Sequence, residues 1–269
     1  MKKNFLILIW TAICFIVLLP ILVLIINSFK TETQLFNQKT FFLFIPTLQN
    51  YTDLLTDKKF STYFFNSLII GVLATCFTLI LGSMAAYGLK EIEFKFKQHL
   101  LITTLVLRIL PPAILIIPVF YLWNLIGIAD TQMGLIVIYI ALNIPFVIWI
   151  LYAFLDTIPK SLIEAAKIDG CNHFKIYTTL ILPLIKPGLI AAGIFVFRVC
   201  WNEFILALIL TNRYSRTLPV YMSLFISEHN IAWGEIMAMG VLVTIPSILI
   251  LIIAYKYIVT GFSFGGIKG

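Results

Sequence analysis

The sequence predicts an all-α membrane protein with six transmembrane helices. Of the 269 residues, 61% are hydrophobic and 12% are charged, whereas about a quarter of the residues of a soluble domain carry a charge. The apolar residues gather in runs of about 20, the length at which a helix crosses a bilayer, and such long runs exclude the strands of a β-barrel. Six spans are expected, at about 5–26, 66–89, 100–123, 132–154, 188–210 and 236–258.

The distribution of basic residues predicts how the spans are oriented. With the N-terminus in the cytoplasm, the inner segments carry eleven of the nineteen Lys and Arg residues and the outer segments carry six. The other two, Arg108 and Arg198, lie within spans. Because cytoplasmic loops are enriched in Lys and Arg, both termini are expected in the cytoplasm. The net charge of +7 is therefore explained by topology and does not indicate a nucleic-acid partner.

The first apolar run, Phe5–Ile26, is expected to remain in the protein as a helix that is kinked near Pro20. It is too long for the core of a signal peptide, and no Ala-x-Ala cleavage site follows it. The outer loop that follows, 27–61, contains an apolar stretch at 41–46 that is suited to the membrane surface. The chain is divided into 1–65, with the first helix and the outer loop, 66–258, with the other five helices, and 259–269, a cytoplasmic tail.

The middle spans contain residues that are unusual in lipid. The second is rich in small side chains, which permit close helix packing: Gly71, Ala74, Gly82, Ser83, Ala85 and Ala86. In the third, Pro111, Pro112 and Pro118 weaken backbone hydrogen bonding, and an arginine such as Arg108 costs roughly 2.5–3.5 kcal/mol by insertion scales. Arg108 is expected either in a structural ion pair or in contact with a solute. The fourth span contains Asn143.

The fifth span carries Arg198, Trp201, Asn202 and Glu203. Arg198 and Glu203 are five residues apart, about 140° around a helix, so they cannot simply pair with each other. Arg198, Trp201 and Asn202 share a face by their spacing. Two interpretations stay open, because polar residues within membranes serve both purposes. They line a path for a polar solute, or they form a packing and hydrogen-bonding knot between helices.

The longest polar interruption of the second half of the chain, 155–187, is expected to fold as a helix, a glycine turn and a helix. Pro159 favours a helix start just after it. Ser161 and Glu164 have the spacing of a capping box, in which each side chain accepts a hydrogen bond from the other residue's backbone N–H. Gly170 supplies the left-handed conformation that ends a helix.

A second short helix is expected after the glycine. Asn172 can cap it, and one of its sides would carry Phe174, Tyr177, Thr178 and Ile181. Pro183 and the pair Pro187-Gly188 break the chain again before the fifth span.

The sequence lacks the motifs of several enzyme classes. It contains no Gly-x-x-x-x-Gly-Lys-Ser/Thr phosphate loop and no His-Glu-x-x-His zinc motif, and no Gly-x-Ser-x-Gly elbow. The three histidines lie in loops and far apart, and the four cysteines fit neither a zinc site nor a disulfide framework. We therefore expect no cofactor or metal in this chain. If ATP drives it, another polypeptide must bind the ATP.

The polar loop resembles the EAA coupling loop of bacterial ABC-importer permeases. Glu-Ala-Ala is followed after three residues by Gly170, and after nine more by x-x-Leu-Pro, with Leu180 where the family usually has Ile. In that family the loop docks into a separate ATPase subunit. The resemblance implies that role for Glu164, Ala165, Ala166, Asp169, Gly170, Leu182 and Pro183.

Other stretches resemble the carbohydrate-uptake permeases of the maltose-transporter type, and in particular the shorter of their two permease subunits. In chain order they are Thr47–Tyr51 ("TLxNY"), Asn66–Leu68 with Ala85–Tyr87 ("NSL" and "AAY"), Gly127–Thr131 ("GLxDT"), Trp201–Phe204 ("WNEF"), Thr217–Val220 and 261–269 ("GAVKG"). The resemblance covers nearly the whole chain. It implies the type I ABC-importer permease fold in the bacterial cell membrane.

The resemblance also implies an assembly. A second, homologous permease would complete a heterodimer, an ATPase dimer would bind ATP and Mg, and an extracellular solute-binding protein would deliver a carbohydrate. The chain itself would be a non-catalytic conduit in the lipid, with an aromatic plane on which a sugar ring can stack. The candidate residues of the substrate path are Arg108, Asn143, Arg198, Trp201, Asn202 and Glu203.

Three alternatives stay open. The chain could be a permease of the same superfamily for a solute other than a sugar. It could be a secondary sugar carrier driven by an ion gradient, although no internal repeat is strong enough to indicate an inverted-repeat transporter. An intramembrane enzyme would need a nucleophile and a base that converge within the spans, and the sequence offers no convincing pair.

Overall fold

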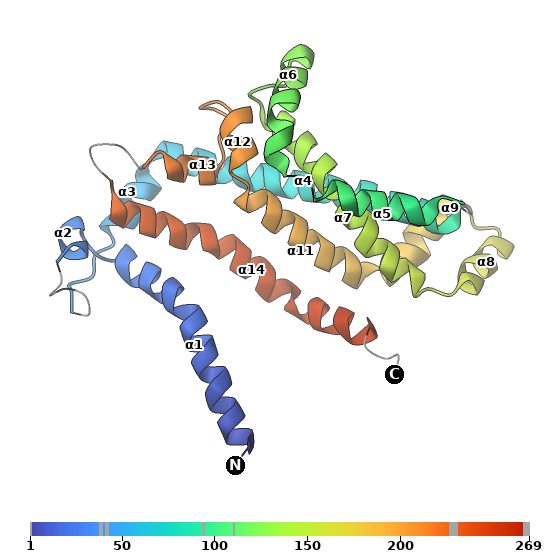
Figure 1. The fold of residues 1–269 in the computed structure, drawn as a ribbon, viewed down its shortest axis with the longest axis horizontal. Coiled ribbons are helices and arrows are strands. Elements are labelled where there is room, and N and C mark those ends of the chain that lie inside the picture. The colour runs from blue at the N-terminus through green and yellow to red at the C-terminus, as the bar shows by residue number, and fades with distance from the viewer. Residues whose placement is uncertain are drawn as a thin grey trace. The chain divides into compact units, whose positions relative to one another are not determined.

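The structure, a computed structural model, is helical as predicted. Within the described residues, the only β-pairing is an isolated bridge between Asp130 and Thr211. The chain forms two compact units, Met1–Phe64 with Val220–Ile248 and Phe65–Pro219 with Leu249–Gly269, and Figure 1 labels their helices. The residues described are 2–37, 40, 43–92, 95–109, 111–225 and 231–265.

The first unit combines a long apolar helix with short helices. Its elements are α1 (Lys2–Ser28), α2 (Glu32–Leu35), α3 (Gln49–Thr56), most of α13 (Leu218–Ser223), and the first parts of α4 (Lys58–Glu91) and α14 (Trp233–Gly265). The candidate span in α1, Asn4–Ser28, has a mean hydropathy of 3.0 and none of its most apolar stretch is buried within the chain. Such a helix is suited to contact with lipid.

The residues of the TLxNY stretch fix α3 to the end of α1. Asn50 donates through Nδ2 to the carbonyl oxygens of Ser28 and Lys30, both at 2.9 Å, and Tyr51 Oη lies 2.6 Å from Ser28 Oγ. Glu32 Oε1 accepts a hydrogen bond at 2.9 Å from the backbone N–H of Gly234. That bond satisfies one of the unpaired donors at the start of α14.

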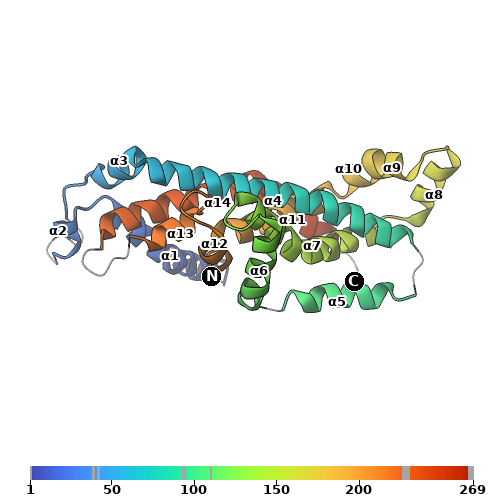
Figure 2. The ribbon, with the colours of Figure 1, turned by 90° about the horizontal axis from the view of Figure 1, so that it is seen from above.

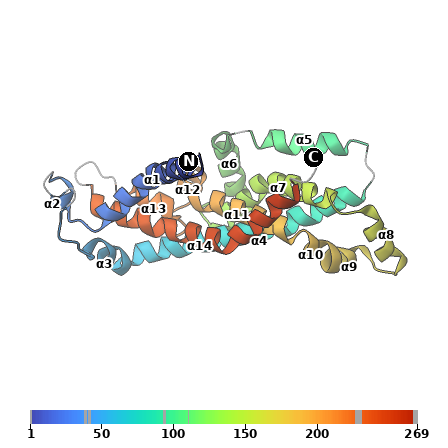
Figure 3. The same cartoon turned by 90° about the horizontal axis from the view of Figure 1, so that it is seen from below.

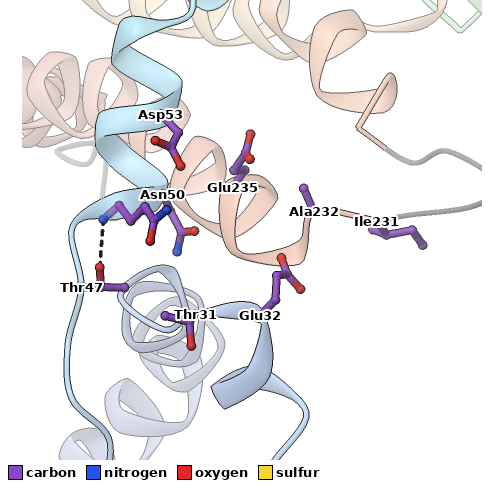
Figure 4. Close-up of a pocket in the computed structure, with 9 residues that line it drawn as sticks. Thr31, Glu32, Thr47, Asn50, Asp53, Ile231, Ala232 and Glu235 are labelled. Carbon is purple, nitrogen blue, oxygen red and sulfur yellow. Dashed lines mark hydrogen bonds between the residues drawn. The ribbon is translucent and has the colours of Figure 1, made fainter.

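A polar cavity of about 280 Å³ lies at this junction in the first unit (Figure 4), and three carboxylates line it, those of Glu32, Asp53 and Glu235. In the same unit, the hydroxyl of Tyr221 donates to the carboxylate of Asp57. Burial, and then this hydrogen bond, raise the pKa of Tyr221 above the ordinary tyrosine value. The hydroxyl therefore stays a proton donor.

The second unit is built on α7 (Gln132–Asp156), which packs against α11 (Lys186–Asn202) and α5 (Lys97–Leu107). The predicted close packing of small residues is present between α4 and α7, where Gly82 faces Val147. The other elements are a 3-10 turn η2 (Pro112–Leu115), α6 (Ile116–Ile126), α8 (Lys160–Ile168), α9 (His173–Lys175), a π-helical turn η3 (Ile176–Ile181), α10 (Leu182–Leu184) and α12 (Ile205–Leu210). Figures 1 and 2 show α6 running across the direction of α7.

Two residues of the NSL stretch hold a loop of the second unit. Asn66 donates through Nδ2 to the carbonyl oxygens of Tyr214 and Arg216 at 2.9 and 3.0 Å. Ser67 Oγ accepts from the backbone N–H of Leu218 at 2.7 Å. Both side chains are buried, so this part of the motif has a structural task in addition to any role in transport.

Helix length and composition support four crossings among the described residues: Asn4–Ser28, Lys58–Glu91, Gln132–Asp156 and Trp233–Ile252. A fifth results if the bent pair His173–Leu184 and Lys186–Asn202, which meet at 77°, forms one span. The count of six, the orientation of the termini and the division at residues 65 and 258 stay predictions. Gly266–Gly269 of the predicted tail lie outside the described residues.

Two of the predicted spans are interrupted by residues outside helices. The third, 100–123, is split between α5 and α6, because Pro111 and Pro112 supply no N–H groups for a continuing helix. The fifth, 188–210, breaks at Glu203, whose backbone is extended with φ −71° and ψ 130°. The chain becomes helical again at Ile205.

Candidate functional site

The polar loop, 155–187, begins with a helix whose start differs from the prediction. α8 begins at Lys160 with Pro159 as its N-cap, and no side chain caps it. The capping box of Ser161 and Glu164 was therefore wrong. Pro159 already provides an extended residue, with ψ 134°, and a carbonyl oxygen that accepts from Leu162 N–H at 3.2 Å. Ser161 consequently lies inside the first turn.

The glycine turn is confirmed. Gly170 has φ +79°, a conformation that costs side chains other than glycine roughly 1–2 kcal/mol. The N–H of Cys171 bonds to the carbonyl of Ala166 and the N–H of Gly170 bonds to that of Lys167, both at 3.0 Å. This pair of bonds is a Schellman motif, which satisfies the last carbonyls of α8.

The second helix of the loop is only partly as predicted. Asn172 caps it, since its Oδ1 accepts from Lys175 N–H at 2.8 Å. The expected common side for Phe174, Tyr177, Thr178 and Ile181 was wrong, because residues 176–181 form a π-helical turn, in which the 3.6-residue period no longer defines a face. Tyr177 and Ile181 are buried, whereas Phe174 is 69% exposed.

The seven predicted coupling residues lie together at one end of the second unit, on α8, the turn and α10 (Figures 1–3). Five are exposed and two, Ala166 and Leu182, are half-buried. The large apolar side chains of Ile168 and Phe174 flank the turn and are 86% and 69% exposed. Sequence reasoning missed Ile168 and placed Phe174 only on one side of the second short helix, although an apolar residue beside a polar turn is a usable signal of a contact surface.

One side of the polar loop packs against the rest of the second unit through buried side chains and a contact between hydroxyl groups. Ile163 is 3% exposed and Ile181 is fully buried. Tyr177 Oη lies 2.7 Å from Ser83 Oγ of α4. A cavity of about 210 Å³ lies between α8 and the end of α4, lined by Lys90, Glu91, Lys160, Ile163, Glu164 and Lys167.

Two of the predicted path residues meet at one aromatic ring. The guanidinium carbon of Arg108 lies 4.2 Å from the ring centre of Phe146 and 4.8 Å from that of Phe195, and Arg198 lies 5.6 Å from Phe195. Such contacts stabilise a cation by its attraction to the ring face. Within the described residues Arg108 forms no ion pair, and its buried Nη1 has no hydrogen-bond partner. The two phenylalanines were not predicted.

Asn143 and Glu203 belong to a second group, joined by Tyr139. Asn143 Nδ2 donates to the Tyr139 carbonyl at 2.8 Å, and the Tyr139 hydroxyl donates to Glu203 Oε2 at 2.8 Å. Glu203 also accepts from the backbone N–H groups of Leu206 and Ala207, at 2.8 and 3.0 Å. The carboxylate thus caps α12 across the break in the fifth span.

Trp201 is buried, which agrees with the packing interpretation of the two that the sequence left open for this span. It is 1% exposed and stacks on Phe197, with ring centres 5.6 Å apart and planes at 18°. Arg198 and Asn202 are exposed, and Asn202 Nδ2 donates to the Arg198 carbonyl at 2.8 Å. The spacing placed the three residues on one side of α11, but packing within the second unit covers the tryptophan.

Comparison with known proteins places this architecture in a family. Residues 78–263 match the family described as binding-protein-dependent transport system inner membrane component. The trehalose/maltose transport system permease protein of Thermococcus litoralis is 37% identical over 258 residues, covering 94% of this chain and 92% of that protein. The trehalose transport system permease protein of Mycobacterium tuberculosis is 36% identical, covering 94% and 93%.

The fold has a counterpart among solved structures. A chain of a bacterial ABC transporter involved in the import of the acidic polysaccharide alginate superposes with a TM-score of 0.81 at 21% identity, covering 96% of each chain. Together with the long apolar helices, the matches identify a multi-pass membrane protein. The chain belongs to the family of inner membrane components of binding-protein-dependent transport systems.

Proposed function

We propose that this chain is the smaller permease subunit of an ABC importer that carries a carbohydrate. The observation that supports this most directly is the exposed loop around Gly170, whose Schellman turn presents Ile168 and Phe174 at one end of the second unit. Apolar side chains at that exposure are suited to a partner surface. The names of two relatives, which transport trehalose or trehalose and maltose, favour a sugar over other solutes.

The proposed topology has six crossings with both termini in the cytoplasm. α5 and α6 together would form the third crossing, and α11 with α12 the fifth. Non-helical backbone at membrane depth is tolerated where it is buried in protein or lines a cavity. The breaks at Pro111 and Glu203 are therefore expected to lie beside a translocation path and not against lipid.

The proposed partners supply what this chain lacks. A second permease would form a heterodimer with it, and a dimeric ATPase would bind ATP and Mg and dock on the loop. An extracellular solute-binding protein would deliver the sugar to the outer side. The chain would perform no chemistry. Closure of the ATPases would move α8, and this movement would switch the helix bundle between inward-facing and outward-facing states.

Among the six path candidates, the geometry favours Arg108, Arg198 and Asn202 for contact with solute. The side chains of Arg198 and Asn202 are exposed, and Arg108 keeps an unpaired Nη1. Asn143, Trp201 and Glu203 are occupied by contacts within the chain. For these three we propose that they hold the helices that carry the path.

The test is a double variant, Glu164→Lys with Gly170→Pro, in the complete importer expressed with the subunits encoded beside it. Uptake is followed with labelled maltose, trehalose, diacetylchitobiose and alginate oligosaccharide, using the sugar that the wild-type assembly accumulates. We expect membrane insertion to persist while uptake and co-purification of the ATPase are lost. Wild-type uptake in this variant would refute the coupling role.

The ion-driven alternative predicts a different energy source. A secondary carrier would continue to accumulate sugar after ATP is depleted and would stop when an ionophore is added. The proposed importer would stop accumulating sugar after ATP is depleted and would continue when an ionophore is added while ATP is maintained.

A further inference from the structure

Glu91 occupies an unfavourable place for a carboxylate. It is the last residue of α4, and the C-terminal end of a helix carries a partial negative charge that disfavours an anion. Its side chain is nevertheless only 13% exposed. Lys167 Nζ of the polar loop compensates it at 2.5 Å, and His173 Nδ1 lies 3.7 Å from the same oxygen, beyond hydrogen-bond distance. The pair with Lys167 offsets the unfavourable interaction of the carboxylate with the end of α4.

The two partners come from opposite sides of the glycine turn. Lys167 belongs to α8, which precedes Gly170, and His173 begins α9, which follows it. The carboxylate therefore pairs with one arm of the turn, through Lys167, and lies beside the other arm at His173. Space is open beside the turn, since no heavy atom other than those of Gly170 and its two chain neighbours would lie within 4 Å of a β-carbon at Gly170.

The neighbouring residue extends the connection to another helix. Lys90 is 8% exposed and pairs with Asp156, the last residue of α7, at 2.8 Å. The last two residues of α4 thus contact the polar loop on one side and the end of α7 on the other. Buried Ile163 and the contact between Tyr177 and Ser83 add apolar and polar support along the same side of the loop.

We propose that Glu91 is a positioning residue for energy coupling. Through its pair with Lys167 it holds α8 to α4, so that a displacement of α8 moves α4 with it. This inference rests on the proposed coupling role of the loop and adds the element that receives the force. Loss of Glu91 would lower the amount of sugar transported per ATP hydrolysed, and it would leave docking of the ATPase unchanged.

The experiment uses the complete importer in proteoliposomes, with the same labelled sugar as above. The variants are Glu91→Lys, Lys167→Glu and the exchange of the two charges, Glu91→Lys with Lys167→Glu. We expect each single variant to keep its ATPase and its ATP hydrolysis, but to lower sugar transported per ATP at least about fivefold, the lower end of typical coupling between sites. The charge exchange restores an ion pair between positions 91 and 167, and it should recover most of the sugar transported per ATP.

A matched control distinguishes loss of the ion pair with Glu91 from loss of any positive charge in the loop. Lys175→Gln changes an exposed lysine of α9 for which no ion pair is observed among the described residues, whereas Lys167→Gln removes the partner of Glu91. We expect the first to transport as wild type and the second to resemble Lys167→Glu in direction. Equal effects of these two variants would overturn the proposal.

Two further results would contradict the role of Glu91. One is a wild-type ratio in Glu91→Lys, and the other is a charge exchange that performs no better than the single variants. Failure of the proposed function has a different signature. In that case the Glu164→Lys, Gly170→Pro variant would transport normally, whatever the behaviour of Glu91.

Discussion

The break in the fifth span offers a measurable test of what Glu203 does. Its carboxylate accepts three hydrogen bonds, from the Tyr139 hydroxyl and the N–H groups of Leu206 and Ala207. Hydrogen bonds within membrane proteins average about 0.6 kcal/mol. Their joint loss in Glu203→Ala is expected to lower the free energy of unfolding by about 2 kcal/mol. Glu203→Gln keeps one acceptor oxygen and should lose about half of that, by the same average.

The assay can use a native thiol. Cys200 is 5% exposed, so in a variant with Cys14, Cys76 and Cys171 replaced by Ser, a thiol-reactive dye reports unfolding near the break. A loss of 2 kcal/mol corresponds to a fall in the midpoint of thermal unfolding of about 4–8 °C. Asn202→Ala, next in sequence but exposed, is the control, with an expected change within about 0.5 kcal/mol.

The reasoning fails if Glu203→Ala unfolds at the wild-type temperature. A Glu203→Gln variant that keeps its stability but takes up sugar with a raised KM would instead assign the carboxylate to the solute. The two roles thus differ in whether stability or affinity changes.

The other predictions concern packing and pH. In Gly82→Ala the new β-carbon would lie 2.5 Å from Val147 Cγ1, so we expect a loss of about 1–3 kcal/mol from overpacking. Adding Val147→Ala removes that atom but leaves Val147 Cβ at 2.9 Å, so it should restore only part of the loss in the same thermal assay. Wild-type stability of Gly82→Ala would argue against close approach of α4 and α7. Because the pKa of Tyr221 is raised in the folded state, the folded protein holds a proton that the unfolded chain releases above about pH 10. The free energy of unfolding should therefore fall as pH rises past that value. Tyr221→Phe, which leaves Asp57 in place, should make this fall less steep between about pH 9 and 11. An unchanged dependence on pH would show that Tyr221 titrates normally.

Several features of the polar loop could be predicted because their causes are local. Gly170 adopts the left-handed conformation and Asn172 caps the next helix, and each depends on residues within one turn. The capping box was wrong because of an equally local competitor, Pro159, which already provides the extended N-cap of α8. The π-helical turn at 176–181 had no sequence signal, so the side expected to be apolar was misplaced.

The sequence by itself determined the membrane class, the approximate apolar spans and the exposed loop with its glycine turn, because composition and backbone preference act over short distances along the chain. Only the tertiary structure decided that Arg108 lies against Phe146 and Phe195, that Tyr139 and Glu203 share a hydrogen bond, and that Glu91 pairs with Lys167. Each of these contacts joins residues that are far apart in the sequence. Their partners are set by how the helices pack, and a packed arrangement leaves no periodic or local mark in the sequence.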